Sequence, residues 1–161
     1  MLDVYTVSFF GHRRIENVFV IERRLETLIR SLLQEKEYVE FLVGRDGEFD
    51  QLVSSTIKRC KHSLGEHNSA LVWVMPYPTA EFRDNEDSFR DYYDEIEVCA
   101  SSSGKHFKAA FQARNHEMVD RSNLVVFCVE KKSGGAYQTM QYARKINACL
   151  INLPEMESVE S

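Results

Sequence analysis

Residues 4–14 read VYTVSFFGHRR, a strand-length apolar run that ends in a glycine and a cluster of basic side chains. The same order returns at YVEFLVGRDGEF (residues 38–49) and at LVVFCVEKKSGG (residues 124–135). In each case a helical pattern follows the turn. Apolar strands that alternate with helices in this way indicate βα units and a parallel sheet.

Two further apolar runs complete the predicted sheet. SALVWVM (residues 69–75) and ACLINL (residues 148–153) each stop at a proline. Both are short and do not alternate with polar residues, as is typical of strands covered on both faces. We therefore predict an α/β protein with a three-layer, Rossmann-like fold, a mainly parallel sheet of about five strands, and helices on both faces.

The helices of this fold follow from apolar spacing. Between the first two strands an apolar stripe repeats at helical intervals, with charged residues turned outward, so it predicts a helix that packs on the core. The stripe consists of Ile21, Leu25, Leu28, Ile29, Leu32 and Leu33. Further helices are expected over 49–62, 104–119 and 137–146.

Length and composition fit one domain. The chain has 161 residues, of which 43% are hydrophobic and 28% charged, and it contains no linker or repeat. We predict a single domain over residues 1–154 and a short acidic tail over 155–161. The net charge of -5 argues against a broad basic face for phosphate backbones, so nucleic acid is not an expected partner.

The cysteine spacing and the lengths of the apolar runs argue against a metal-binding protein and against a membrane protein. Cys60, Cys99, Cys128 and Cys149 form no CxxC pair and no zinc-ligand spacing, so we expect reduced thiols, no metal site and no required cofactor. The first residues lack a basic region before an apolar stretch, and no apolar run approaches the roughly 20 residues that span a bilayer. We expect a cytoplasmic protein without membrane contact.

The acidic, aromatic segment PYPTAEFRDNEDSFRDYYDE (residues 76–95) interrupts the βα pattern. It follows a strand end, where loops often carry function, so it is either a lid or a solvated connection with a short helix. Its rings at Phe82, Phe89, Tyr92 and Tyr93 either anchor a protein partner or pack back on the sheet.

Three glycine-containing turns are expected to meet at one edge of the sheet. They lie at Gly11, at Gly44 and Gly47, and at Gly134 and Gly135. The carboxyl ends of parallel strands share an edge, and glycine lets the backbone approach a ligand closely. Because each following helix offers free N–H groups to an anion, the edge predicts a site for a nucleotide-sized ligand.

The side chains around these turns suggest contacts to such a ligand. Arg13 or Arg14 could grip a phosphate, and His12 could bond a ribose or base or serve as a structural histidine. In the second turn Asp46, Glu48 and Asp50 could accept ribose hydroxyls, or Asp46 could cap the helix. On the third helix, Arg114 either binds the ligand or pairs with an acidic group such as Asp120 or the 76–95 segment. Neither Ser122 nor His116 belongs to a visible catalytic triad.

Six short elements follow one another along the chain: FFGHRR (9–14), FLVGRDGEFD (41–50), PY (76–77), ARNHEMVDRSN (113–123), SGGAYQTMQYA (133–143) and INLP (151–154). In this order they resemble the SLOG superfamily, the Rossmann-like group that includes the Lonely Guy phosphoribohydrolases and the DNA-processing A proteins. The resemblance spans nearly the whole chain and is closest to the small, single-domain branch. It implies a bacterial or phage protein, often a homodimer, that binds nucleotides or derivatives such as ADP-ribose or NAD-related compounds.

The sequence differs from the family's catalytic motif at one important position. Lonely Guy enzymes pair an Arg of an RKxxM element with a Glu of a PGGxGTxxE turn; here Arg114 matches the Arg, but Gln141 stands at the Glu spacing. An amide cannot transfer a proton as a carboxylate does, so catalysis by that route is not expected. Ala136 replaces the Thr of the usual GGT turn, with Thr139 and Tyr137 near enough to substitute for its hydroxyl.

Three functional hypotheses result. The first is a sensor that holds a nucleotide-derived ligand at the carboxyl edge of the sheet. The second is a nucleotide N-glycosidase, with Arg114 on the phosphate and Asp50, Glu48 or Asp120 in place of the missing Glu. The third is a protein-interaction subunit that uses the 76–95 segment. The candidate ligand-binding residues are Gly11, His12, Arg13, Arg14, Gly44, Arg45, Asp46, Gly47, Arg114, Asn115, Met118, Gly134, Gly135 and Ala136.

Overall fold

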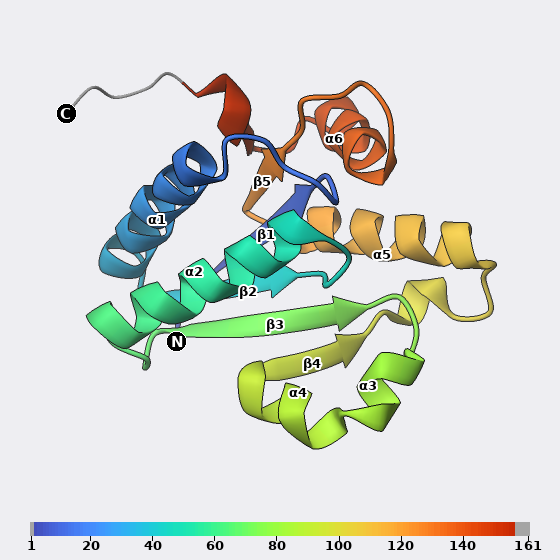
Figure 1. Ribbon diagram of the computed structural model, residues 1–161, viewed down its shortest axis with the longest axis horizontal. Helices are drawn as coiled ribbons and strands as arrows, with labels where there is room; N and C mark the ends of the chain where they lie inside the picture. The colour runs from blue at the N-terminus through green and yellow to red at the C-terminus, as the bar shows by residue number, and fades with distance from the viewer. Residues whose placement is uncertain (1, 157–161) are drawn as a thin grey trace.

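The computed structural model describes residues 2–156, which alternate strands and helices along the chain (Figure 1). In order, the elements are β1 (Val4–Gly11), α1 (Val18–Glu35), β2 (Tyr38–Val43), α2 (Glu48–Leu64), β3 (Ser69–Met75), α3 (Ala80–Asp84), α4 (Glu86–Tyr92), β4 (Glu95–Val98), η1 (Ala100–Ser102), α5 (Phe107–Arg121), β5 (Leu124–Cys128), α6 (Gly135–Lys145), β6 (Leu150–Asn152) and η2 (Leu153–Glu155).

The strands form one sheet of six, all parallel, in the order β4-β3-β2-β1-β5-β6. This confirms the predicted α/β, three-layer, Rossmann-like fold, with one strand more than the expected five or so. The additional strand is β4, whose sequence EIEV is short and carries two glutamates. It lies at the sheet edge, where charged side chains are tolerated and the apolar signal of an interior strand is absent.

Helices cover both faces and enclose two apolar cores. One core contains buried residues of α1 and α2, including Leu25, Ile29 and Phe49, packed on inward residues of β1, β2 and β3. The other contains Met118 of α5 and Met140 of α6. Figure 1 shows α1 and α2 side by side on one face of the sheet. Both faces are therefore shielded from water, as the continuous apolar strands require.

Strand order fixes where a ligand crevice can form. Successive strands run outward from β1 to β4, and the chain then returns to place β5 on the other side of β1. The chain continues from β1 to α1 on one face and from β5 to α6 on the other, so the order of strands reverses between these two connections. In open α/β sheets this reversal of strand order is where ligands bind.

The 76–95 segment folds back on the sheet. It forms the short helices α3 and α4, and the rings of Phe82, Phe89 and Tyr93 pack around Trp73 with ring centroids 5.0–5.9 Å from its own. These three residues are buried, so they are not available as anchors for a protein partner. Of the sequence alternatives, the structure therefore supports a packed connection with short helices.

Other expectations have simple outcomes. The four cysteines are free thiols, and of these only Cys149 is exposed. Within residues 2–156, no helix combines the length and apolar character needed to cross a membrane. The predicted helices over 49–62, 104–119 and 137–146 correspond to α2, α5 and α6 with shifts of up to three residues at their ends. Most of the predicted acidic tail lies outside the described residues.

Candidate functional site

A cavity of about 530 Å³ opens at the carboxyl end of the sheet, beside the reversal of strand order between β1 and β5. Its walls come from the loops after β1 and β2, from α5, and from the start of α6. Eleven of the residues predicted from the sequence line it: Gly11, His12, Arg13, Gly44, Asp46, Asp50, Arg114, Asn115, Gly134, Gly135 and Ala136. We call this cavity the crevice.

Arg114 occupies the deep end of the crevice and is already paired. Its side chain is 4% exposed, and Nη2 donates to Asp46 Oδ2 at 2.7 Å. Nη1 donates to the Val74 carbonyl at 3.2 Å, and Nε donates to Asn115 Oδ1 at 3.0 Å. Of the acidic partners considered from the sequence, Asp120 instead accepts from the Tyr142 hydroxyl. Arg114 is therefore a buried, hydrogen-bonded cation held by the β2–α2 turn.

A second carboxyl group lies beside this ion pair. Asp50 is buried, and its Oδ2 accepts a hydrogen bond from the Asp46 backbone N–H at 2.8 Å. Burial, together with the neighbouring Asp46 carboxylate, raises the pKa of Asp50 to about 7. Near neutral pH one of the two carboxyl groups is thus ionised against Arg114, while the other can hold its proton.

Gly44 leaves room for this cluster. A Cβ at this position would lie 3.0 Å from Asp46 Oδ2, 3.2 Å from Arg114 Nη1 and 3.2 Å from Asp50 Oδ2. These contacts are tighter than ordinary van der Waals separations. The glycine after β2 therefore makes space for the protein's own charged groups.

The glycines at Gly11 and Gly47 have a different structural use. A Cβ on Gly11 would lie 2.4 Å from the Phe49 ring, and one on Gly47 would lie 2.5 Å from Arg13 Cα. The two turns are also joined by a hydrogen bond from the Glu48 N–H to the Arg13 carbonyl at 2.9 Å. The β1 and β2 turns are therefore locked against each other by close backbone packing.

The turn before α6 is open. Nothing lies within 4 Å of a Cβ built on Gly134, and on Gly135 only Gln112 Nε2 comes near, at 3.7 Å. Gly134 has φ 91°, a left-handed value that favours glycine, and no side chain caps the helix. The first N–H groups of this 11-residue helix therefore face the crevice with a positive helix end, an arrangement suited to an anion.

His12 connects the β1 turn to the loop that leads to α6. Its Nε2 accepts hydrogen bonds from the backbone N–H groups of Glu130, at 3.2 Å, and Lys131, at 3.1 Å. Partial burial and the nearby Lys131 lower the pKa of His12, which favours the neutral ring that these two bonds need. Of the two sequence readings, this geometry supports the structural one.

Aromatic and polar groups that the sequence reading did not select line the mouth of the crevice. Phe107 and Phe111 of α5 lie there with Lys108, and the ring of Tyr77 packs against both phenylalanines. Phe107 is 53% exposed, which is unusual for so large an apolar side chain. The sequence signal that could have indicated this aromatic wall is the pair of phenylalanines four residues apart at the start of a helix. Phe9, Phe10, Gln112 and Gln138 complete this wall.

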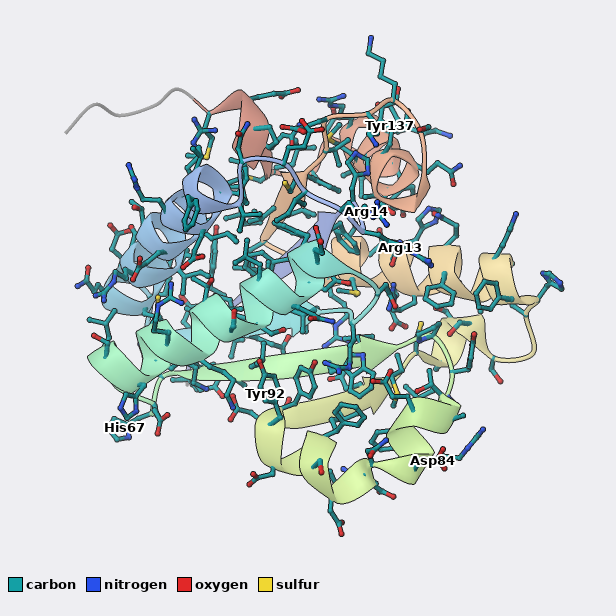
Figure 2. All side chains as sticks on the ribbon, in the orientation of Figure 1. Arg13, Arg14, His67, Asp84, Tyr92 and Tyr137 are labelled. Atoms are coloured by element: carbon teal, nitrogen blue, oxygen red, sulfur yellow. The ribbon has the colours of Figure 1, made fainter. Side chains whose placement is uncertain are left out.

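Some predicted residues lie elsewhere. Figure 2 labels Arg13 and Arg14 on the loop after β1, but only Arg13 lines the crevice. Arg45 points away from it and pairs with Glu81 at 3.2 Å. Met118 is fully buried in the core between the sheet and α5. Gly47 packs on the β1 turn, as described above.

The remaining candidates for catalysis are separated from the crevice. Glu48 Oε2 accepts a hydrogen bond from the Ile15 N–H at 3.0 Å, and Asp120 is bonded to Tyr142 on the outer surface. Gln141, at the family's glutamate spacing, donates to the Tyr137 hydroxyl instead of lining the cavity. Thr139 is buried and donates to the Gly135 carbonyl, so it does not replace the missing turn hydroxyl.

One acidic cluster lies on the edge of the sheet far from these loops. Within the described part of the chain, carboxylate oxygens of Glu40, Glu95 and Glu97 come within 4.8 Å of one another. Arg121 already pairs with Glu40 and Glu97 there, at 3.5 Å and 2.7 Å. A protein cation therefore already offsets part of the negative charge of this cluster.

Fold and crevice together define a Rossmann-like protein with a ligand-sized cavity at its strand reversal. Among solved structures, DNA processing protein A (DprA) from Streptococcus pneumoniae is similar, with a TM-score of 0.65 and 17% identity over 91% of this chain and 49% of that one. DNA processing protein A from Helicobacter pylori gives 0.60 and 18% over 91% of this chain and 63% of that one. The chain thus spans about half to just under two thirds of these proteins.

These likenesses confirm the predicted Rossmann-like fold. No protein-family model and no curated protein sequence matches the chain.

The comparisons correct one expectation about partners. The Helicobacter pylori structure is described by its single-stranded DNA binding mode, so the related fold does accommodate nucleic acid. The inference from the net charge of -5 that nucleic acid is not a partner was therefore wrong. Net charge reports on the whole surface, whereas a single strand can be held by ring stacking and a few local donors in one groove.

Proposed function

We propose that the crevice binds a nucleotide or a nucleotide-derived ligand such as ADP-ribose, with its phosphate at the Gly134–Gly135 turn. One observation carries the proposal: the uncapped end of α6 lines a cavity of about 530 Å³, with nothing within 4 Å of a Cβ on Gly134 and only Gln112 Nε2 near one on Gly135. Cavities of about 300–1,000 Å³ are usual for ligands of this size.

The expected position of the phosphate follows from which hydrogen-bond donors of the crevice have no protein partner. Arg114 is committed to Asp46, Val74 and Asn115, so it does not offer an unpaired guanidinium to an incoming anion. The N–H groups at the start of α6 have no side-chain cap, and Lys108 and Arg13 line the cavity as exposed cations. The phosphate is therefore expected at α6, and Arg114 serves to position Asp46.

The other end of the ligand is expected near Asp46. Its carboxylate is held by Arg114 yet remains 33% exposed, so it can accept hydrogen bonds from ribose hydroxyls. The Phe111 ring, which lies 5.1 Å from the Arg114 guanidinium, offers a flat apolar surface beside it for a base. A nucleotide placed in this way would use both polar ends and the aromatic wall of the crevice.

The test is calorimetric titration with AMP, ADP-ribose and inorganic phosphate, preceded by mass spectrometry of small molecules released from the purified protein. Two glutamines of α6 provide a matched pair, because Gln138 lines the crevice and Gln141, three residues later, does not. Gln138→Ala and Gly135→Val should weaken AMP binding at least tenfold, while Gln141→Ala should leave it unchanged. Equal affinity in all four proteins, or no saturable binding of any probe, would overturn the proposal.

Single-stranded DNA is the second candidate ligand. Two observations favour it: the described binding mode of the Helicobacter pylori neighbour, and the exposed Phe107 ring at the mouth of the crevice. Phe107 and Phe111 lie 5.0 Å apart between ring centroids, and Lys108 is adjacent. Stacking of a base on such a ring contributes about 1–3 kcal/mol, whatever the base.

Fluorescence anisotropy of a labelled dT15 oligonucleotide at low and physiological salt tests this candidate. Phe107→Ala should weaken binding roughly 5- to 100-fold, in line with the loss of one stacked base. Phe19→Ala, which removes an even more exposed phenylalanine from α1, is the control and should have no effect. Oligonucleotide binding that is insensitive to Phe107 and to added AMP would place it outside the crevice.

A further inference from the structure

A second cavity, of about 700 Å³, lies between α2 and α4. Its walls include Leu52 and Ser54 of α2, Phe89 and Tyr92 of α4, and Ile15 from the loop before α1. Lys58 of α2 holds Tyr92 in place, because its Nζ donates to the Tyr92 carbonyl at 2.7 Å and lies 4.2 Å from the centre of the Tyr92 ring. Figure 2 labels Tyr92 on this side of the molecule.

The charged groups of this cavity are already engaged with other protein groups. Arg45 pairs with Glu81 and lies over the Phe89 ring at 4.8 Å. Glu48 accepts from the Ile15 N–H, and Asp50 accepts from the Asp46 N–H. Since its one arginine is neutralised and the other charges are carboxyl groups, the cavity does not favour an anion such as a phosphate.

The uncommitted polar groups are neutral. The hydroxyl of Ser54, a residue only 2% exposed, has no hydrogen-bond partner within residues 2–156. The next two hydroxyls of α2, those of Ser55 and Thr56, both donate to the Leu52 carbonyl. An unpaired buried hydroxyl is destabilising, so a polar group that reached Ser54 would recover the lost hydrogen bond.

More neutral groups surround Ser54 in this cavity. The side chains of Gln51, Ser88 and Tyr92 also line it, and none makes a side-chain hydrogen bond to another described residue. Together they offer an amide, an aliphatic hydroxyl and a phenol beside apolar and aromatic surface. This combination suits an uncharged molecule with a flat ring and several hydroxyl groups.

We propose that the α2–α4 cavity is a second binding site, distinct from the crevice, for an uncharged nucleoside. Its ring would lie against Tyr92 and Leu52, and its ribose hydroxyls would bond the hydroxyl and amide groups from Ser54, Ser88 and Gln51. Gly44 and Asp50 line both this site and the crevice, and the other residues that line the two cavities are different. The proposal does not depend on a phosphate being bound at α6.

Titration of the full chain with adenosine and cytidine, followed by amide NMR, tests the proposal. Saturable shifts are expected for residues of α2 and α4, and Gln51→Trp should reduce adenosine affinity at least tenfold by filling the cavity. Gln34→Trp is the matched control, because Gln34 is also an exposed helical glutamine but belongs to α1. Ser88→Trp fills the cavity from α4 and serves as a second variant if Gln51→Trp does not fold.

The outcomes separate this site from the crevice. AMP binding should be unchanged by Gln51→Trp and weakened by Gln138→Ala. Adenosine binding should be weakened by Gln51→Trp and unchanged by Gln138→Ala. Adenosine shifts that are lost in Gln138→Ala and kept in both tryptophan variants would overturn the second site. Absence of saturable nucleoside binding would overturn it as well, whatever the result for AMP.

Discussion

The turns after β1 and β2 and the turn after β5 look alike in the sequence, yet the folded protein uses them differently. Gly11 and Gly47 are required because Phe49 and the Arg13 backbone occupy the space where a side chain would be. Gly134 and Gly135 have almost nothing near them on the crevice side. The first two turns use glycine for internal packing, whereas the third leaves backbone donors free for a ligand.

The charged residues divide in the same way. Arg114 and Asp46 are held together at the deep end by the β2 turn, while the cations near the mouth, Arg13 and Lys108, are exposed. Substitutions in the interlocked part should therefore act mainly on stability. Substitutions around the open turn should act mainly on binding, and four variants test that division.

The largest effect is expected from Arg114→Ala. Removing one partner of a buried ion pair leaves the other charge uncompensated, which costs about 3–5 kcal/mol in the free energy of unfolding. Urea denaturation of the variant and of Arg13→Ala measures the difference, since Arg13 lines the same crevice but is exposed. Arg13→Ala should stay within about 0.5 kcal/mol of the wild type. Similar stability of the two variants would remove the distinction between the deep end and the mouth.

Gly47→Ala should have the next largest effect. The φ of Gly47 is -173°, which any residue adopts, so the cost is steric: the new Cβ would lie 2.5 Å from Arg13 Cα. Overpacking of this kind costs about 1–3 kcal/mol, which should lower the thermal midpoint by several degrees. A midpoint equal to that of the wild type would mean that the two turns can separate without loss.

Asp50→Asn changes how stability depends on pH. Because the pKa of Asp50 is raised to about 7 in the folded protein, the folded state binds a proton that the unfolded chain releases near its ordinary value of 3.8. Wild-type stability should therefore fall as the pH rises from about 4 to 7, by at most about 1.4 kcal/mol per pH unit, and level off above 7. The asparagine variant should lack this slope.

Denaturation at several pH values checks this dependence, with Asp84→Asn as the control. Asp84 is an exposed carboxylate of α3 (Figure 2), so its replacement should leave the slope intact. Parallel pH profiles for wild type and Asp50→Asn would contradict the assignment of the proton to Asp50.

Gly135→Ala should have the smallest effect on stability. Its Cβ would meet only Gln112 Nε2 at 3.7 Å, and alanine at a compatible site stabilises by about 0.4–1 kcal/mol through the unfolded chain. The same methyl group would project into the crevice and should weaken AMP binding. Scanning calorimetry measures the stability of the variant, and titration calorimetry of the same preparation measures its AMP affinity, so the two effects are separated. A destabilised variant with normal AMP affinity would reverse the comparison between the turns.

The sequence predicted most of the fold correctly because its interior strands are continuous apolar runs. Covered on both faces, β1, β2, β3 and β5 need no alternation, and each stands out from its helical surroundings. The pattern missed β4, since an edge strand of four residues with Glu95 and Glu97 lacks that signal. The aromatic segment over 76–95 could be read in two ways because rings that face Trp73 and rings that face a partner have the same composition.

The candidate site was predicted in part. The order of strands and glycine turns was enough to bring Gly11, Gly44 and Gly134 to one edge. The sequence did not distinguish Arg13, which lines the crevice, from Arg14 and Arg45, which do not. Neighbours in a loop point in different directions, and a single sequence does not record which. Phe107 and Phe111 were not selected as site residues, because apolar side chains at helical spacing are equally typical of a helix face that packs on the core.

The sequence by itself determined the class of fold and the edge of the sheet at which the glycine turns meet, because both follow from local apolar patterns and from the geometry of parallel strands. Only the tertiary structure decided which glycines are free, that Arg114 pairs with Asp46, and that a second cavity lies between α2 and α4. Those features depend on contacts between residues far apart in the chain, such as Asp46 and Arg114, and on the space that side chains leave unfilled. Neither is encoded in local spacing.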